Sequence, residues 1–141
     1  MSNHETPKQS LEGPDLFLES LVNLVTGSGW EVGLTLQVGG FLVSGLLVSG
    51  RAFLEALGTD FSSALPNEEA AAAVRKSYSE LADKIYGESS AAPQNRPVYI
   101  HLKNARLFSS NGAPIPANRG LWWRGRLTEV QGFVLGSLSQ S

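Results

Sequence analysis

The chain has 141 residues, the usual length of one domain, and its composition of 42% hydrophobic and 17% charged residues suits a packed core rather than a disordered polypeptide. It contains no cysteine, which excludes disulfide bonds, thiolate metal sites and cysteine nucleophiles, and which fits a cytoplasmic protein. The net charge of −2 argues against non-specific binding of nucleic acid by the whole surface.

The charges are unevenly distributed along the chain. Residues 1–92 contain five Lys/Arg and twelve Asp/Glu, a net charge of −7, whereas residues 93–141 contain six Lys/Arg and one Glu, a net charge of +5. Such an asymmetry can steer self-association or the encounter with a charged partner. The alternative is that the two parts fold together and partly neutralise each other.

The N-terminal end shows no recognisable targeting segment. Residues 1–10 are polar and are expected to form a flexible tail, and residues 11–141 are expected to form a single α+β domain. The longest apolar run, residues 38–57, is interrupted by glycine, serine and charged residues, so we expect no membrane span.

The first half of the domain is predicted to begin with a helix and a β-hairpin. Helical spacing of apolar residues predicts a helix over Pro14–Thr26 that Gly27 ends. The apolar period then changes to two, which predicts strands over residues 30–38 and 41–48. Gly39-Gly40 between them favours a tight hairpin, because such turns need positive φ.

Two helices are predicted to follow, as an insertion over residues 50–86. Ser49 can cap a short helix over Arg51–Leu57 that Gly58 ends. The alanine-rich segment 66–86 predicts a longer helix, because alanine is the strongest helix former. The apolar stripe expected on that helix consists of Ala70, Val74, Tyr78, Leu81 and Ile85.

The C-terminal part is predicted to be β-structure. A strand begins at residue 98 and runs on toward Phe108, a turn-rich loop spans residues 109–120, and residues 121–127 and 133–138 form a closing hairpin. Short antiparallel strands with an N-terminal helix favour an α+β fold with a small SH3-like or Sm-like antiparallel β-barrel, or a strongly bent sheet.

Signals for an enzyme are weak. His101 lies in a predicted strand and is a conceivable acid–base group, but a lone strand histidine is more often an ordinary surface or half-buried residue. The sequence contains no nucleophile-elbow, phosphate-loop or zinc-protease motif and no metal-ligand spacing. We therefore expect no catalytic residue, no metal site and no cofactor.

Alternation in the C-terminal strands places aromatic and basic residues on one face. Adjacent strand residues point to opposite faces, so Trp122 and Trp123 are separated. With Trp123 in the core, the candidate partner-binding residues face outward: Tyr99, His101, Lys103, Trp122, Arg124 and Arg126. Tyrosine, tryptophan and arginine are favoured at binding hot spots. The alternative is an ordinary solvated face on which Trp122 packs under the alanine-rich helix.

Three C-terminal segments, Tyr99–Asn104, Trp123–Leu127 and Glu129–Gly136, resemble the gas vesicle accessory protein GvpU family. The N-terminal half agrees more loosely, over an early helix and the stretch Leu34–Gly45. The resemblance implies a cytoplasmic accessory protein that acts in the assembly, organisation or clustering of gas vesicles, the protein-shelled gas compartments that make bacteria buoyant. It implies gas vesicle shell or accessory proteins as partners.

The sequence therefore predicts a non-enzymatic protein that self-associates into a homo-oligomer and binds a protein partner through its C-terminal sheet. Exposed sheet edges and the opposite charges of the two parts motivate the self-association. The alternative is an Sm-like module for single-stranded RNA, in which Tyr99 and Trp122 stack on bases and Lys103 and Arg124 contact phosphates. The acidic net charge opposes that alternative, and a small enzyme using His101 is disfavoured.

Overall fold

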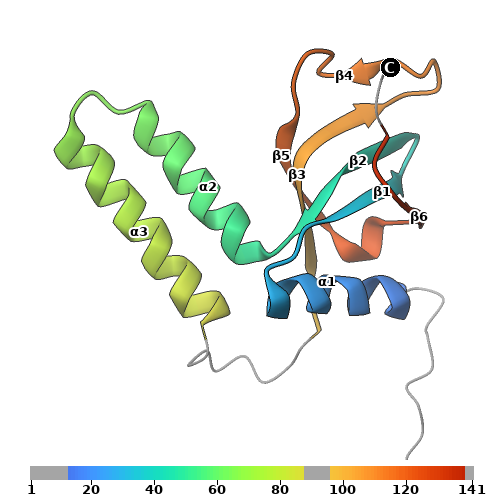
Figure 1. Cartoon of the computed structure of the whole chain (residues 1–141), viewed down its shortest axis with the longest axis horizontal. Helices are drawn as coiled ribbons and strands as arrows, with labels where there is room; N and C mark the ends of the chain where they lie inside the picture. Colours follow the sequence, from blue (N-terminus) through green and yellow to red (C-terminus); the bar gives the residue numbers. More distant parts are fainter. Residues whose placement is uncertain (1–12, 88–95, 139–141) are drawn as a thin grey trace, which may run out of the picture.

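A computed structural model of the chain describes residues 13–87 and 96–138. The described residues form three α-helices, one short 3-10 helix and six strands (Figure 1). In chain order these are α1 (Leu16–Ser28), β1 (Val32–Val38), β2 (Phe41–Val48), α2 (Gly50–Ser63), α3 (Glu68–Tyr86), β3 (Tyr99–Phe108), β4 (Pro114–Ile115), β5 (Leu121–Arg126), the 3-10 helix (Leu127–Glu129) and β6 (Gly132–Leu135). The predicted tail, residues 1–10, lies outside the described residues, as do residues 88–95 between the predicted helices and the C-terminal strands.

Helix α1 is shifted by two residues from its predicted position. Asp15 is the N-cap, and its Oδ1 accepts a hydrogen bond of 2.8 Å from the Phe17 N–H, so Pro14 precedes the helix. The helix continues through Gly27 and ends at Gly29, which has a positive φ of 75°. Gly29 adopts the left-handed conformation that is common at helix C-termini. The predicted end of the helix at Gly27 is therefore wrong by two residues.

The predicted hairpin of β1 and β2 is confirmed. The two strands pair from Val32 opposite Leu47 to Val38 opposite Phe41, which leaves Gly39 and Gly40 as the two turn residues. Gly39 has a positive φ of 61°, the conformation for which glycine is needed. The apolar strand β2 is central, since it lies between β1 and β3.

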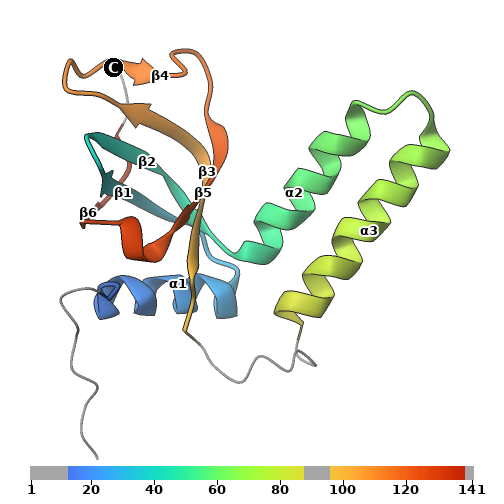
Figure 2. The same ribbon diagram turned by 180° about the vertical axis from the view of Figure 1, so that it is seen from behind.

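Helices α2 and α3 form an antiparallel hairpin that projects from one end of the sheet (Figures 1 and 2). Gly58 does not end α2: it is buried, and a Cβ atom built on it would lie 2.7 Å from the Tyr78 Cβ. The glycine thus allows the two helices to approach closely. The predicted stripe on α3 is only partly correct, because Leu81 and Ile85 are exposed while the buried positions are Ala71 and Ala82.

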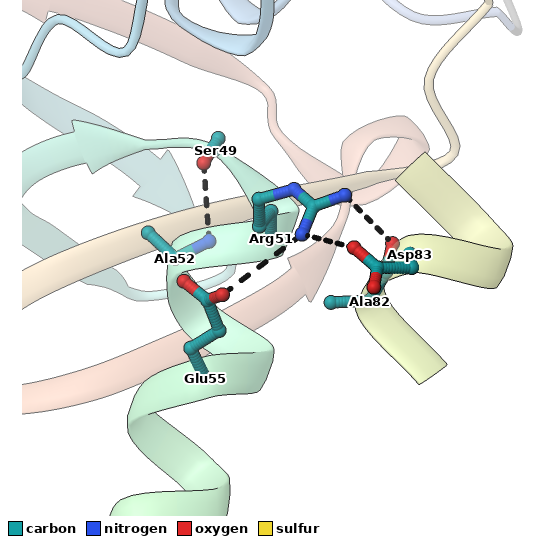
Figure 3. Close-up of polar contacts among 6 residues, drawn as sticks. All are labelled: Ser49, Arg51, Ala52, Glu55, Ala82 and Asp83. Atoms are coloured by element: carbon teal, nitrogen blue, oxygen red, sulfur yellow. Dashed lines mark hydrogen bonds and ion pairs between the residues drawn. The ribbon is translucent and has the colours of Figure 1, made fainter. Parts of the chain in front are cut away.

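Hydrogen bonds and ion pairs connect α2 and α3 where the helical hairpin meets the sheet (Figure 3). Ser49 caps α2 as predicted, through a 3.1 Å hydrogen bond from the Ala52 N–H to its Oγ. Arg51, in the first turn of α2, donates to the Asp83 carboxylate at 2.8 Å and to the Ala82 carbonyl at 3.4 Å, near the end of α3. Arg51 also lies 3.9 Å from Glu55.

The six strands form one antiparallel sheet that is not closed. The order is β4-β3-β2-β1-β6, and β5 also pairs with β3. Strands β5 and β6 therefore lie at opposite edges of the sheet. The predicted closing hairpin between them is wrong. The reason is the 3-10 turn: Leu127 is buried in the core and turns the chain away from β3 toward β1. The α+β class is confirmed, whereas a closed barrel is not found.

One face of the sheet, the inner face, packs on α1 (Figure 2). Its core side chains come from α1, the first three strands and the 3-10 turn, and they include Leu18, Val22, Val25, Leu34, Leu36, Val43, Leu47, Ile100, Leu102 and Leu127. Glu19 of α1 is also buried, and its carboxylate forms a two-point ion pair with the Arg96 guanidinium, with both N···O distances at 3.1 Å. This pair ties α1 to the start of β3.

A bulge in β3 changes which side chains face inward. Ser44 pairs with Arg106 and Leu46 pairs with Lys103, so β3 has one residue more than β2 between these two pairs. Asn104 has a positive φ of 55° at this point. A Cβ atom on Gly45, which lies opposite, would be 2.8 Å from the Lys103 carbonyl oxygen, so the close approach requires glycine there.

Candidate binding face

The six predicted site residues lie on the outer face of the sheet, the face opposite α1. The pairing of β3 with β5 sets Tyr99 opposite Arg126 and His101 opposite Arg124. Side chains of directly opposed residues share a face, so alternation along both strands groups all six residues. The register therefore places these residues on one face, but their burial differs strongly.

The prediction that the His101 side chain faces solvent is wrong. It is only 4% exposed, and its ring centroid lies 4.9 Å from that of Phe53 in the first turns of α2. Burial, together with the nearby Arg124 guanidinium, lowers the pKa of His101 from 6.5 to about 4, because the protonated ring is poorly solvated there. His101 is therefore a neutral packing residue at physiological pH.

Trp122 lies between burial and exposure. Its ring meets Phe53 edge-to-face with a centroid distance of 6.2 Å, so α2, rather than the alanine-rich α3, covers it in part. Trp123 points to the other face and packs against the core, and its ring lies where a Cβ atom of Gly125 would be. The prediction that the two tryptophans point to opposite faces is correct. The alternative prediction, that a helix covers Trp122, holds for the end of the outer face next to Phe53.

Arg124 and Arg126 remain exposed beside Tyr99. The guanidinium carbons lie 3.8 Å and 5.7 Å from the centroid of the Tyr99 ring, Arg124 being the closer. Arg124 also interacts with Tyr86 at the end of α3, where burial raises the pKa of the tyrosine hydroxyl and the arginine opposes that rise. The two guanidinium groups thus lie near the Tyr99 ring, close to the end of α3.

Most other cations of the described chain have an acidic partner. Salt bridges join carboxylates to Arg51, Arg75, Lys76, Arg96 and Lys103. Lys103 of the predicted site pairs with Glu31 at 3.2 Å. Among the residues that the structure describes, no such salt bridge includes Arg124 or Arg126. The exposed positive charge of the outer face is therefore left without a carboxylate from the described chain.

The family comparison covers nearly all of this fold. The family described as gas vesicle protein GvpU-like matches residues 15–138, from the cap of α1 to the last described residue. The chain belongs to the GvpU-like family. No curated protein and no solved structure matched it. The resemblance seen in three C-terminal segments therefore extends over the helical hairpin as well as the sheet.

Sequence reasoning missed one arginine of this GvpU-like chain, Arg106. Simple alternation along β3 would direct Arg106 inward, but the bulge at Asn104 moves it to the outer face opposite Ser44 and sends Ala105 to the core. Arg106 is half-buried, and its Nε atom has no hydrogen-bond partner within the described part of the chain. In the sequence, the asparagine itself is the signal for the bulge, because asparagine tolerates the positive φ that Asn104 adopts.

The far end of the outer face is closed by the C-terminal segment of the GvpU-like fold. Thr35 donates to the Gly136 carbonyl at 2.8 Å and lies 3.0 Å from the Ser44 hydroxyl, which accepts the Leu138 N–H. Both hydroxyl residues are buried and hydrogen-bonded, as buried polar groups must be. The open part of the outer face is therefore the region around Tyr99 and the two arginines.

Neither a metal site nor a membrane helix is found in residues 13–87 and 96–138. No cluster there brings together three side chains of the types that hold metal ions. None of the described helices is long and apolar enough to cross a bilayer. The arrangement of Tyr99, Arg124 and Arg126 offers aromatic contact and guanidinium hydrogen bonds, which are means of recognition rather than of bond cleavage.

Proposed function

We propose that the chain is a non-enzymatic, cytoplasmic accessory protein of gas vesicles, which self-associates and binds an acidic protein surface through the outer face. Membership of the GvpU-like family supports the connection with gas vesicles. The observation that supports the binding site is the pair Arg124 and Arg126, exposed over Tyr99 without a carboxylate partner in the described chain. Two fixed guanidinium groups suit carboxylates, which they bind in a two-pronged geometry.

The burial of His101 supports a non-enzymatic role. A general acid or base must come within hydrogen-bond distance of its substrate, and His101 is covered by Phe53. Its pKa of about 4 also removes the charged form near neutral pH. The partner class follows from charge: the two arginines have no carboxylate partner among the described residues and would bind anions, which the vesicle shell or another accessory protein would supply as Asp or Glu.

A flotation assay tests this proposal, because gas vesicles rise on centrifugation and carry bound protein with them. We expect the wild type to enter the floating layer and the double variant Arg124→Gln/Arg126→Gln to lose binding by about tenfold or more, as for the loss of charged hot-spot contacts. Raised salt should weaken the wild type as well. The matched control is Arg75→Gln/Lys76→Gln on α3, which removes two positive charges whose partners lie within the helical hairpin and should float like the wild type.

Equal flotation of the arginine variant and the control would contradict the proposed site. A parallel titration with a fluorescent single-stranded RNA separates the two partner classes, since stacking on Tyr99 and phosphate contacts would serve RNA too. We expect no RNA binding at the salt concentration at which vesicles are bound. Tight RNA binding that is lost in the arginine variant, without vesicle binding, would replace the protein partner by a nucleic acid.

A further inference from the structure

The two edges of the sheet differ in their protection against pairing with another strand. One edge, formed by β4 and β5, contains Pro114 and the exposed Arg124 and Arg126. Proline and charged side chains are the usual devices that keep an edge from pairing. The other edge, β6, has the sequence Gly-Phe-Val-Leu, with neither charge nor proline. Within residues 13–87 and 96–138, strand β6 is an unprotected edge.

The free hydrogen-bonding groups of β6 can be assigned from its register with β1. The Gly136 N–H donates to the Gly33 carbonyl at 2.8 Å, and Val134 lies opposite Thr35, two residues farther along each strand. Hydrogen-bonded pairs alternate in an antiparallel ladder, so Val134 is directed at β1. The N–H and C=O groups of Phe133 and Leu135 therefore point away from β1, along the open edge.

Large apolar side chains are exposed beside this edge. Val134 is 61% and Leu135 64% exposed, and Phe17 of α1, which stacks on Phe133 at a centroid distance of 5.9 Å, is 62% exposed. The only charged residue of α1 is Glu19, which is buried and paired with Arg96. Strand β6 itself carries no charge, so two copies of it can pair without like charges directly opposite each other, whereas the arginine edge cannot.

We propose that β6 is the self-association surface and that it pairs with β6 of a second copy, antiparallel about a two-fold axis at Val134. This inference rests on the self-association in the proposed function and names its location. Phe133 of each copy would form a hydrogen-bonded pair with Leu135 of the other, which uses the outward backbone groups of both. Each exposed Leu135 would then pack on the Phe133–Phe17 ring pair of the second copy.

The geometry specifies a crosslinking experiment, because the chain has no native cysteine. Val134 would lie opposite Val134 of the second copy in a non-hydrogen-bonded pair, with Cα atoms about 4.5 Å apart. That distance lies within the range that a disulfide spans. We expect Val134→Cys to form a covalent dimer under mild oxidation. The control is Ile115→Cys on β4, which is 54% exposed at the protected edge and should crosslink only slightly.

Sedimentation velocity supplies the second measurement. At about 50 µM, the wild type should contain dimers, and Val134→Lys should weaken the association by about tenfold or more, because two lysines would meet on the axis. Ile115→Lys should sediment like the wild type. Thermal melting checks that both variants remain folded, as exposed positions permit.

The outcomes separate this inference from the proposed function. If the wild type associates but Val134→Lys associates equally well and Val134→Cys crosslinks no better than Ile115→Cys, the β6 surface is wrong and self-association stands. If the wild type is monomeric at this concentration, both are wrong, and a strand of another protein becomes the remaining occupant of the edge. Loss of vesicle flotation in the arginine variant, with crosslinking intact, would show that the two surfaces act independently.

Discussion

The inner and outer faces of the sheet are built from the same strands, yet the three central strands are buried on the inner face, whereas burial on the outer face varies from residue to residue. On the inner face, Leu34, Leu36 and Leu102 are fully buried beneath α1. On the outer face, His101 is buried under Phe53, whereas Arg124, directly opposite it in β5, is exposed. The outer face therefore combines a packed anchor for the helical hairpin with an open charged surface.

The strand and the face on which a residue lies therefore do not show whether its side chain contributes to folding stability or to partner binding. The outer face is covered at one end by α2 and at the other by the C-terminal segment that hydrogen-bonds to Thr35 and Ser44. Arg124 and Arg126 are exposed beside Tyr99, next to the part that α2 covers. Substitutions on one face should consequently range from strongly destabilising to nearly neutral, and measured unfolding free energies can test the assignment residue by residue.

The largest effect is expected on the inner face, for Leu102→Ala. Leu102 is fully buried in the core, so the truncation removes apolar burial and leaves a cavity. We expect a loss of about 4 kcal/mol in the free energy of unfolding, measured by chemical denaturation with tryptophan fluorescence. The neighbouring Lys103→Ala, on the outer face, should cost less than about 1 kcal/mol, since it removes only an exposed ion pair with Glu31. Similar losses for both would erase the distinction between the faces.

The two adjacent tryptophans allow a direct comparison of the two faces, because the same side chain lies on the outer face at Trp122 and on the inner face at Trp123. Trp123→Ala should cost about 3 kcal/mol, since the ring packs on the core and covers Gly125. Trp122→Ala should cost about 1–2 kcal/mol, chiefly from its edge-to-face contact with Phe53. Differential scanning calorimetry of both variants gives the order. A larger loss for Trp122 would mean that the helical hairpin contributes more to stability than α1 does on its side.

Acid should selectively weaken the packed end of the outer face through His101. The unfolded chain binds the imidazole proton near pH 6.5, whereas the folded chain binds it only near pH 4. The unfolded state therefore holds more protons between these values, so stability is complete above about pH 6.5 and falls as the pH decreases toward 4. We expect a contribution of about 3 kcal/mol, measured as the difference in pH dependence between the wild type and His101→Phe. Parallel pH profiles would contradict the burial of the neutral ring.

The local structure of the N-terminal half could be predicted from the sequence to within a few residues. The period of two and Gly39-Gly40 define the hairpin, and Ser49 caps α2, because these signals act between residues close in the chain. Gly58 misled the prediction of the end of α2, since its role is to admit Tyr78 from a different helix. A glycine in a helical pattern does not by itself distinguish a stop from a close helix–helix contact.

The long-range arrangement could not be predicted, because it depends on contacts between segments far apart in the sequence. Strand β6 pairs with β1, about 100 residues earlier, and nothing in its own sequence names that partner over β5. Alternation grouped the six site residues correctly, but it carried no information that Phe53 would cover His101. The bulge at Asn104 shows the same limit, since one inserted residue moved Arg106 to the opposite face from the one that alternation gives.

The smallest effect on stability is expected at the open end of the outer face, for Arg124→Gln. The guanidinium is exposed, has no salt bridge within the described residues and contacts only the Tyr99 ring among the interactions described above, so the free energy of unfolding at neutral pH should change by less than about 1 kcal/mol. The change should nevertheless be visible at His101. Arg124 helps to lower the pKa of that imidazole, although burial is the larger cause. Its removal should therefore raise the pKa of His101 while leaving it below 6.5, and should reduce the loss of stability in acid. An NMR titration of the His101 ring measures this shift, with Arg126→Gln as the control that keeps Arg124. An unchanged pKa in Arg124→Gln would separate the arginine from the packed histidine, and the two halves of the outer face would then be electrostatically independent.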